Sequence, residues 1–244
     1  MTRLVDLTAE DARRAAPWLA VPVGSCEQHG PHLPLGTDSI IADVLCEHLA
    51  QRVPNVVVAP AITVSASGEH AGFAGTLSIG VDVTADVLLE YVRSADWAGG
   101  VILVNGHGGN RAAIGRAVAT ATAEGRRLHA WWPVVAHGDA HAGHTETSLL
   151  LAIRPELVRR HLAEPGERRP LVAITRELRD GGVRAVSANG VLGDPTTATL
   201  DAGTRLLDRL VDDLVSSVTG VVTGTDHDDP PIQPRDIGPP ARSA

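Results

Sequence analysis

Residues 25–39, which read SCEQHGPHLPLGTDS, gather several side chains that can bind a metal into one short stretch. The stretch contains Glu27, His29 and Asp38, and its glycines and prolines are incompatible with a continuous helix. In an extended backbone Glu27 and His29 point to the same side. Asp38 begins a helical pattern and either returns toward them or serves only as the N-cap of that helix. Taken alone, the stretch fits a polar, glycine-rich surface loop as well as a metal site.

Two later stretches also place histidines and acids after short apolar runs. His107 follows GVILV within NGHGGN, between glycines that let a ligand approach the backbone. The third stretch, HGDAHAGHTE at residues 137–146, contains His141 and Glu146. Each residue alone has an ordinary alternative, such as a histidine bonded to nearby backbone or a first-turn carboxylate of a helix. Together the three loops predict one shared site, because ligands bind at the carboxyl ends of strands in open α/β sheets.

The expected ligand set consists of two imidazoles and three carboxylates: Glu27, His29, Asp38, His107 and Glu146. Such a set suits Zn²⁺, Mn²⁺ or Fe²⁺ and is poor for copper. One catalytic zinc usually takes three protein ligands, whereas two metals that share a carboxylate use all five. A metal pair activates a water as a nucleophile at neutral pH. We therefore expect hydrolysis of an amide-like bond.

The composition favours one α/β domain and excludes several functions. Of the 244 residues 43% are hydrophobic, and all 21 basic residues are arginines. Without lysine the chain forms neither a lysine Schiff base nor a P-loop phosphate site. The formal charge of −8 argues against nucleic-acid binding. Two cysteines make no disulfide framework, no apolar run reaches the ~18 residues of a membrane span, and no signal-peptide core is present, so we expect a cytoplasmic protein.

Strand and helix patterns alternate along the chain. Strand patterns cover residues 19–24, 55–65, 100–106 and 127–136, and helical patterns cover residues 38–53, 83–99, 110–125, 145–153 and 204–222. Asn110 is a candidate N-cap and Gly125 a candidate helix stop. The alternation predicts right-handed crossovers and an α/β fold with a mostly parallel central sheet. Residues 1–223 are expected to form a single domain and the Pro-rich residues 224–244 a disordered tail.

Four segments occur in the order shown by the creatininase (creatinine amidohydrolase) family: EQHGPHLPLGTD, SGEHAGFAGTLSIG, NGHGGN and HAGHTETSLLLA. The chain resembles this family over roughly residues 18–200. The resemblance implies a three-layer, Rossmann-like sandwich, two divalent metal ions (Zn, Fe or Mn) and a homo-oligomer, hexameric or octameric. Four positions match metal ligands of the family, with the third as the bridge between the metals: Glu27, His29, Asp38 and His107. His141 matches the catalytic histidine that moves the proton.

One position departs from the family pattern. Creatinine-hydrolysing members carry a glutamate ligand two residues after the strand-end histidine, where this chain has Gly109. The fifth ligand is therefore expected to be Glu146, and creatinine is not the expected substrate. Gly108, whose backbone N–H is free for a developing oxyanion, and Ser67 are the candidates for substrate contact.

Within the family, SGEHAGFAGTLSIG, DAHAGHTETS and NGVLGDPTTAT (residues 189–199) resemble peptidases that remove a C-terminal Val-Tyr-derived dipeptide from a modified ribosomal precursor peptide. The resemblance implies this peptide as substrate and partner, although NGVLGDPTTAT alone fits an ordinary turn. One alternative is another amidohydrolase of the family, acting on creatinine or on a formamide intermediate of flavin or deazaflavin synthesis. The other is a non-catalytic metal-binding protein, against which His141 argues because a storage site needs no spare base.

Overall fold

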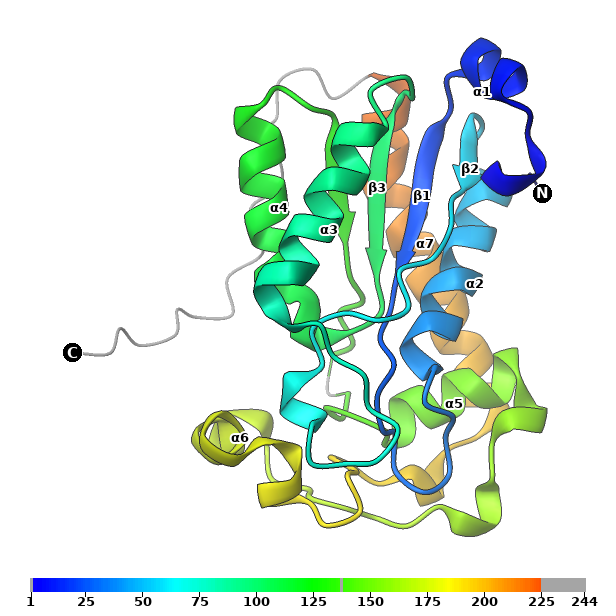
Figure 1. Ribbon diagram of the computed structural model, residues 1–244. Helices are drawn as coiled ribbons and strands as arrows, with labels where there is room; N and C mark the ends of the chain where they lie inside the picture. Colours follow the sequence, from blue (N-terminus) through cyan, green and yellow to red (C-terminus); the bar gives the residue numbers. More distant parts are fainter. Residues whose placement is uncertain (1, 137, 225–244) are drawn as a thin grey trace.

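The computed structural model describes residues 2–136 and 138–224. Its strands form one parallel sheet in the order β2-β1-β3-β4 (Figure 1). The strands are β1 (Trp18–Val23), β2 (Val56–Val58), β3 (Gly100–Asn105) and β4 (Leu128–Trp131). The α-helices are α1 (Ala9–Ala15), α2 (Thr37–Arg52), α3 (Gly80–Ser94), α4 (Arg111–Ala123), α5 (His144–Ile153), α6 (Leu171–Val186) and α7 (Leu200–Thr223). Short 3-10 helices are η1 (Leu4–Asp6), η2 (Gly68–His70), η3 (Gly108–Asn110), η4 (Pro155–Leu157), η5 (Arg160–Leu162) and η6 (Pro195–Thr197).

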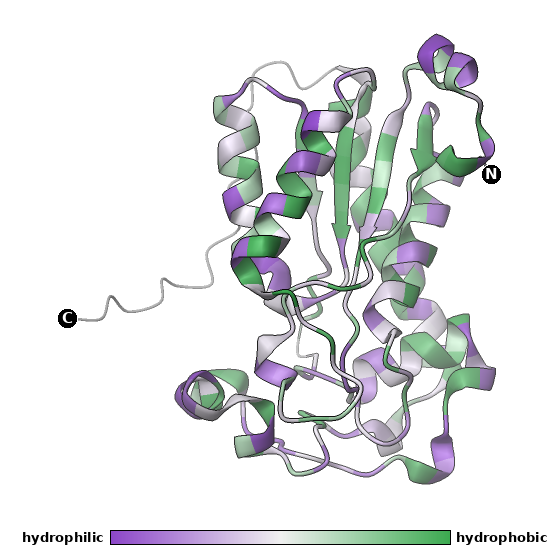
Figure 2. Ribbon diagram, viewed as in Figure 1, coloured by the Kyte–Doolittle hydropathy of each residue, from purple (hydrophilic) through white to green (hydrophobic). Residues whose placement is uncertain are grey.

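Helices cover both faces of the sheet, which gives three layers (Figure 1). Trp18 and Ala20 of β1 face a core shared with α2, α5 and α7. Leu19 and Val21 face the opposite core, shared with α3 and α4. Successive side chains of a strand point to opposite faces, so a sheet buried on both sides needs a continuous apolar run, as the hydropathy colouring shows (Figure 2). The expected α/β sandwich with a parallel central sheet is confirmed.

Two strands are shorter than their sequence patterns. The run at residues 55–65 gives only β2, and the run at 127–136 gives a strand that ends at Trp131. Pro60 and Pro133 follow these strands closely, and proline has no backbone N–H to donate to a neighbouring strand. After β2 the chain continues through isolated bridges, Val23 with Ile62 and Ser65 with Ser78. It thereby passes over the carboxyl end of the sheet.

The helix α6 was not expected from the sequence. It is amphipathic, and its apolar side buries Ile174 and Val183. Gly182 within it has a left-handed φ of 68°, and a side chain there would overlap the backbone carbonyl of Glu69. This close approach packs α6 against η2 beside the carboxyl end of the sheet.

Asn110 stands at the N-cap position of α4, but its side chain does not cap the helix. Its Oδ1 accepts from the backbone N–H of Ala66, and its Nδ2 donates to the Gly24 carbonyl and to Asn105 Oδ1. Asn110 therefore ties together the loops that follow β1, β2 and β3. The predicted N-cap position is confirmed, but the side chain makes no capping bond, because these buried groups of the loops take its hydrogen bonds.

Gly125 has a left-handed φ of 71° just after α4, where the sequence predicts a helix stop. Apart from Gly224, the segment expected to be a disordered tail lies outside the described residues, as does residue 137. Within the described part of the chain, no helix has both the length and the apolarity that a bilayer crossing requires.

Candidate metal centre

The carboxyl end of the sheet gathers donors from five segments, all buried except the half-buried Glu146. The loop after β1 supplies Glu27 and His29, the first turn of α2 supplies Asp38, and the loop after β3 supplies His107. The segment before α5 supplies His141, and the first turn of α5 supplies Glu146. Among the described residues, three groups have donor atoms within 4.8 Å of one another: Glu27, Asp38 and His107; His29, Asp38 and Glu146; Glu27, His29 and His141.

Asp38 belongs to two of these groups and lies between two imidazoles. Its Oδ1 is 3.1 Å from His29 Nε2, and its Oδ2 is 3.1 Å from His107 Nδ1. Ser25 Oγ donates to Oδ2 at 2.7 Å. The N-cap position of α2 is Gly36, so the interpretation of Asp38 as an N-cap is wrong. A carboxylate with one oxygen toward each donor group could bridge two metal ions.

The backbone fixes which nitrogen of each ring is free. His29 Nδ1 lies 3.1 Å from the Glu27 carbonyl, and His107 Nε2 lies 2.9 Å from the Ala66 carbonyl. A carbonyl oxygen only accepts, so each of these nitrogens carries the proton. In the neutral rings, the form that binds a metal, the lone pairs of His29 Nε2 and His107 Nδ1 then point toward Asp38. An N–H bond to a carbonyl that fixes the ring is the usual partner arrangement of a metal-binding histidine.

Glu27 shows that the residues present fit a cation. Its side chain is completely buried, and neither carboxylate oxygen has a hydrogen bond of good geometry among the described residues, although His70 Nε2 and His107 Nε2 lie 3.3 and 3.2 Å away. Leaving a buried charged group without a partner costs several kcal/mol, on the order of the penalty for a broken buried ion pair. A divalent cation between Glu27, Asp38 and His107 would satisfy it, and this mixture of carboxylates and imidazoles suits Zn²⁺, Mn²⁺ or Fe²⁺.

The charges of the site are strongly coupled. Burial lowers the pKa of His29, but Asp38, Glu146 and Glu27 outweigh it and raise that pKa to about 9. Burial raises the pKa of Asp38, but the two histidines beside it hold that pKa well below its usual range. Burial, with Asp38 and Glu27, raises the pKa of Glu146 to about 7. The cluster therefore holds its charge through partners rather than through water.

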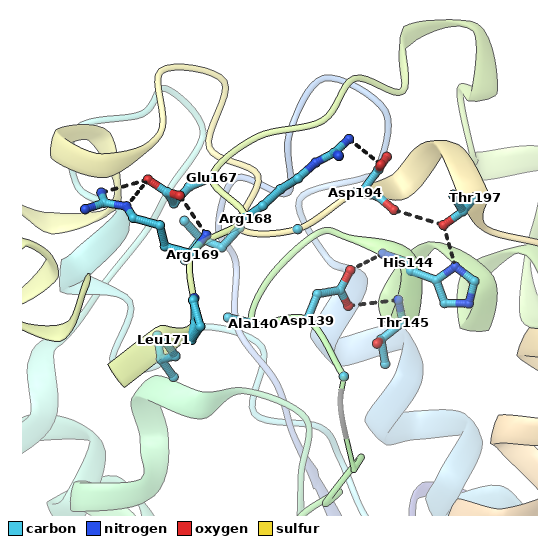
Figure 3. Close-up of a pocket in the computed structure, with 14 residues that line it drawn as sticks. Asp139, Ala140, His144, Thr145, Glu167, Arg168, Arg169, Leu171, Asp194 and Thr197 are labelled. Atoms are coloured by element: carbon cyan, nitrogen blue, oxygen red, sulfur yellow. Dashed lines mark hydrogen bonds and ion pairs between the residues drawn. The ribbon is translucent and has the colours of Figure 1, made fainter. Parts of the chain in front are cut away.

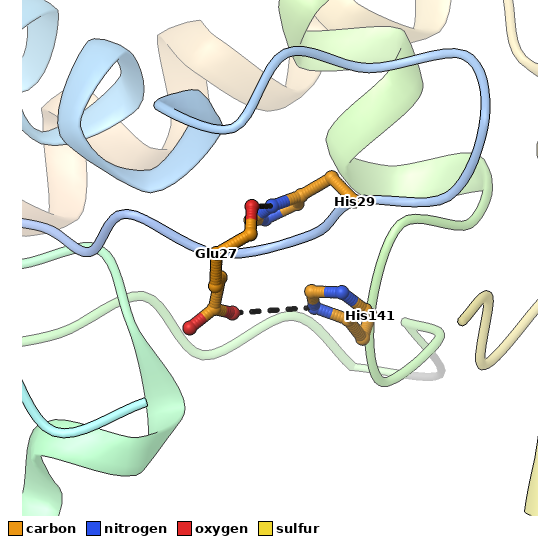
Figure 4. Close-up of side chains that lie close together, drawn as sticks. All are labelled: Glu27, His29 and His141. Atoms are coloured by element: carbon orange, nitrogen blue, oxygen red, sulfur yellow. Dashed lines mark hydrogen bonds and ion pairs between the residues drawn. The ribbon is translucent and has the colours of Figure 1, made fainter. Parts of the chain in front are cut away.

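His141 contributes a neutral ring beside Glu27 (Figure 4). Its Nε2 donates to the Gln28 carbonyl at 2.8 Å, which leaves the Nδ1 lone pair 3.7 Å from Glu27 Oε1. Burial, followed by repulsion from His29 and His70, lowers the pKa of His141 well below its usual value.

Sequence reasoning missed three neighbours of the site. His70 was not among the residues expected in the site, but its Nε2 is 3.3 Å from Glu27 Oε1 and its ring centroid is 4.4 Å from that of His141. Gln28 lies between His70 and His141. Glu69 Oε1 is 3.5 Å from His107 Nε2. The conspicuous SGEHAGF segment was the available signal for two of them, but no strand pattern placed it at the sheet end.

The two residues expected to contact substrate lie at the same end of the sheet. Ser67 is buried, and its Oγ has no hydrogen-bond partner among the described residues. Gly108 is exposed at the start of η3, and a Cβ there would meet no described atom within 4 Å. A side chain at Gly109, in contrast, would overlap Glu69 Oε1, His107 Nε2 and the Ala66 carbonyl. Next to His107 the described residues therefore leave space at Gly108 and none at Gly109.

A pocket of about 420 Å³ adjoins the segment that carries His141 (Figure 3). Ala140 and Leu192, which line it, hydrogen-bond to each other through their backbones next to His141. Its charged groups have partners, since Arg168 pairs with Asp194 and Arg169 pairs with Glu167. The pocket therefore offers room near the site without an unpaired charge among the described residues that line it.

Comparison with known proteins identifies the family. The family model of creatinine amidohydrolase (creatininase) matches residues 5–218, most of the chain. The chain belongs to the creatininase family. A crystal structure of creatinine amidohydrolase superposes with a TM-score of 0.79, covering 89% of this chain and 96% of that one at 21% identity. A structure described as Creatininase Mn gives a TM-score of 0.77. At such identity these neighbours show the fold alone.

Relatives of higher identity carry another name. The mycofactocin precursor peptide peptidase of Mycobacterium ulcerans (strain Agy99) is 49% identical over 221 residues, covering 86% of this chain and 88% of the relative. That of Mycolicibacterium smegmatis is 46% identical over 211 residues, covering 84% and 85%. The creatinine amidohydrolase of Pseudomonas putida is 26% identical over 235 residues, covering 82% and 88%. Within the creatininase family this chain is thus more similar to these peptidases than to that creatininase.

Proposed function

We propose that this protein is a dinuclear-metal peptidase that removes a C-terminal, Val-Tyr-derived dipeptide from the modified mycofactocin precursor peptide. The observation that supports it most is the 49% identity, over most of both chains, to a relative named mycofactocin precursor peptide peptidase. Membership of an amidohydrolase family and the buried donor groups support a metal-dependent hydrolase. In this proposal the protein works as a homo-oligomer, hexameric or octameric.

In this proposal five residues hold the metal pair: Glu27, His29, Asp38, His107 and Glu146. Asp38 would be the bridge, because it belongs to two of the three donor groups, one with Glu27 and His107 and the other with His29 and Glu146. The ions are Zn, Fe or Mn, and solved creatininases are described as a Zn–Zn type and as a Mn form. When bound, such a pair supplies a Lewis acid for the scissile carbonyl and a water of lowered pKa.

The chain's own residues then bind substrate and move the proton. His141 is the general base: its Nε2–H on the Gln28 carbonyl holds the Nδ1 lone pair in the site, where it accepts the proton of the attacking water and returns it to the leaving amine. Gly108 offers its backbone N–H and Ser67 its hydroxyl to the substrate. The pocket beside Ala140 has room for residues that flank the scissile bond.

The test is hydrolysis of the modified precursor peptide by purified protein, followed by mass spectrometry of the fragments. We expect loss of a mass equal to the C-terminal dipeptide, loss of this activity on chelation, and its recovery with Zn²⁺, Fe²⁺ or Mn²⁺. The His141→Ala variant serves as the metal-loaded, inactive control.

Creatinine and a formamide substrate are run in parallel to test the alternatives. Turnover of either of these without cleavage of the peptide would make the protein another amidohydrolase of the family. Metal binding without any hydrolysis would make it a metal-binding protein.

A further inference from the structure

Three histidines of the site are oriented by the backbone, and one is not. His29, His107 and His141 each direct one ring nitrogen to a backbone carbonyl. His70 has no such carbonyl in its described hydrogen bonds, and its Nδ1 lies 2.9 Å from the side-chain Nε2 of Gln28. The proton position on His70 therefore depends on the orientation of the Gln28 amide.

Two backbone groups fix that orientation. The Gly30 N–H donates to Gln28 Oε1 at 2.9 Å, and Gln28 Nε2 donates to the Gly190 carbonyl at 3.0 Å. A backbone N–H only donates and a carbonyl only accepts, so the oxygen and nitrogen of the amide cannot be exchanged. Gln28 is 5% exposed, so water does not compete for these bonds.

The number of hydrogens on the Gln28 amide then determines which ring nitrogen is protonated in His70 and in His141. The Gln28 amide nitrogen carries two hydrogens and lies near three partners: the Gly190 carbonyl, His70 Nδ1 and, at 3.1 Å, His141 Nε2. His141 Nε2 cannot accept, because it carries its own hydrogen toward the Gln28 carbonyl. The two amide hydrogens therefore go to Gly190 and His70. The free nitrogen of His70 is Nδ1, and its Nε2 carries the hydrogen.

We propose that Gln28 is a positioning residue whose side-chain amide holds His70 as a hydrogen-bond donor opposite the lone pair of His141. His70 Nε2 is 3.3 Å and His141 Nδ1 is 3.7 Å from the same oxygen, Glu27 Oε1, and the two ring centroids are 4.4 Å apart. One ring accepts a proton and the other donates a hydrogen bond at one point in the cavity. The role of this histidine pair in turnover rests on the proposed function: His141 takes the proton of the water while the His70 N–H stabilises the developing oxyanion.

This arrangement explains why the chain has a glycine in the NGVLG turn at residues 189–193. Gly190 has a left-handed φ of 80°, and a side chain there would overlap Gln28 Oε1. Two residues on, the Leu192 N–H donates to the His141 carbonyl at 2.8 Å. The turn thus holds the amide of Gln28 and the backbone of His141 in one relative position.

The test is ¹⁵N NMR of the imidazole rings in the full protein, both chelated and loaded with Zn²⁺, because ¹⁵N shifts distinguish the two neutral forms of histidine. In the wild type we expect His70 protonated at Nε2 and His141 also at Nε2. In Gln28→Glu the donor becomes an acceptor, so His70 should carry its hydrogen on Nδ1 while His141, held by a backbone carbonyl, stays unchanged. The matched control is Thr76→Val, which removes the 3.2 Å bond to the Gln28 backbone N–H but leaves the amide, and His70 should not change.

A second variant covers the case in which Gln28→Glu fails to fold. Gln28→Met keeps the length of the side chain without a donor, and we expect a mixed proton position on His70, wild-type metal content, and a kcat at least ten-fold lower with little change in KM. A wild-type His70 protonated at Nδ1, or an unchanged His70 in either variant, would overturn the proposal. Because the NMR readout needs no substrate, absence of peptide hydrolysis would refute the proposed function and leave the placement of the hydrogens standing.

Discussion

Raising the pH from 6.5 to 9 is expected to destabilise the metal-free protein. The carboxylates around His29 outweigh its burial and raise its pKa from 6.5 to about 9. A histidine whose pKa is higher in the folded state stabilises that state fully below pH 6.5 and loses this contribution as the pH rises through the folded pKa. The shift corresponds to about 3 kcal/mol of unfolding free energy. The pKa of His107 is raised for the same reason after burial lowers it, so its contribution has the same sign.

The other titrating groups do not reverse this trend. Burial raises the pKa of Glu146 to about 7, so its contribution also becomes less favourable as the pH rises from 4.5 through 7. Burial lowers the pKa of His70 and of His32 to about 4. These two histidines, with His141 and His129, whose pKa values burial also lowers, favour the folded state increasingly as the pH rises, and this gain levels off about one unit above pH 6.5. The stability of the metal-free protein should therefore fall between pH 6.5 and 9, most steeply above about pH 7.5.

Metal binding should show the opposite pH dependence. A metal at His29 Nε2 displaces the proton that the raised pKa holds there, so binding releases at least one proton. Each proton released increases the binding constant about ten-fold per pH unit, or about 1.4 kcal/mol. The stabilisation by a fixed concentration of free metal should therefore grow as the metal-free protein weakens.

Urea unfolding at pH 6.5, 7.5 and 8.5, with EDTA or with Zn²⁺ at a buffered free concentration, measures both effects. The matched control is Asp38→Asn, which removes the carboxylate that most raises the pKa of His29 and should flatten both slopes. A metal-free stability that is constant or rises above pH 6.5 would refute the reasoning. So would an equal pH slope in Asp38→Asn.

Two further predictions concern single side chains of the site. His141→Ala should retain metal and lose about 10²–10⁴-fold in kcat, as expected for a general base, whereas His107→Ala should lose metal as well. Measuring metal content beside kcat separates the two variants. Equal metal loss in both would contradict the assignment of His141. Gly109→Ala should lower metal affinity at least ten-fold, because its Cβ would overlap His107 Nε2, whereas Gly108→Ala, whose Cβ meets no described atom within 4 Å, should bind metal as the wild type does. Competitive titration against a chromogenic chelator measures this second pair, and equal affinities would contradict it.

The sequence could predict those site residues that directly follow a strand, because ligands bind at the carboxyl ends of strands in open α/β sheets. Glu27 follows β1 and His107 follows β3, and these neighbouring strands end at the same edge of the sheet. An apolar run followed by glycine and a polar residue is therefore enough to place both. The helix patterns after the loops then bring in Asp38 and Glu146 as first-turn residues.

The missed residues depend on contacts that local pattern does not encode. His70 lies on η2, which follows a strand cut short after Val58 and passes across the sheet end by isolated bridges. Gln28 sits between two expected ligands, but the value of its amide appears only when Gly190, more than 160 residues away, supplies the fixed carbonyl. Helix α6 does carry an apolar side, with Ile174 and Val183 buried, but Gly182 interrupts its helical backbone, and no helix was expected there.

Gly109 illustrates how one changed position redistributes roles across a site. The family pattern places a ligand glutamate there, but in this chain any side chain would overlap Glu69 Oε1 and His107 Nε2. The space is taken by Glu69, whose carboxylate enters from η2 rather than from the loop after β3. The carboxylate that completes the second donor group comes instead from α5, where Glu146 Oε2 lies 3.8 Å from His29 Nε2. The two acids therefore stand on different elements, and beside His107 the described residues leave room for a side chain at Gly108 but not at Gly109.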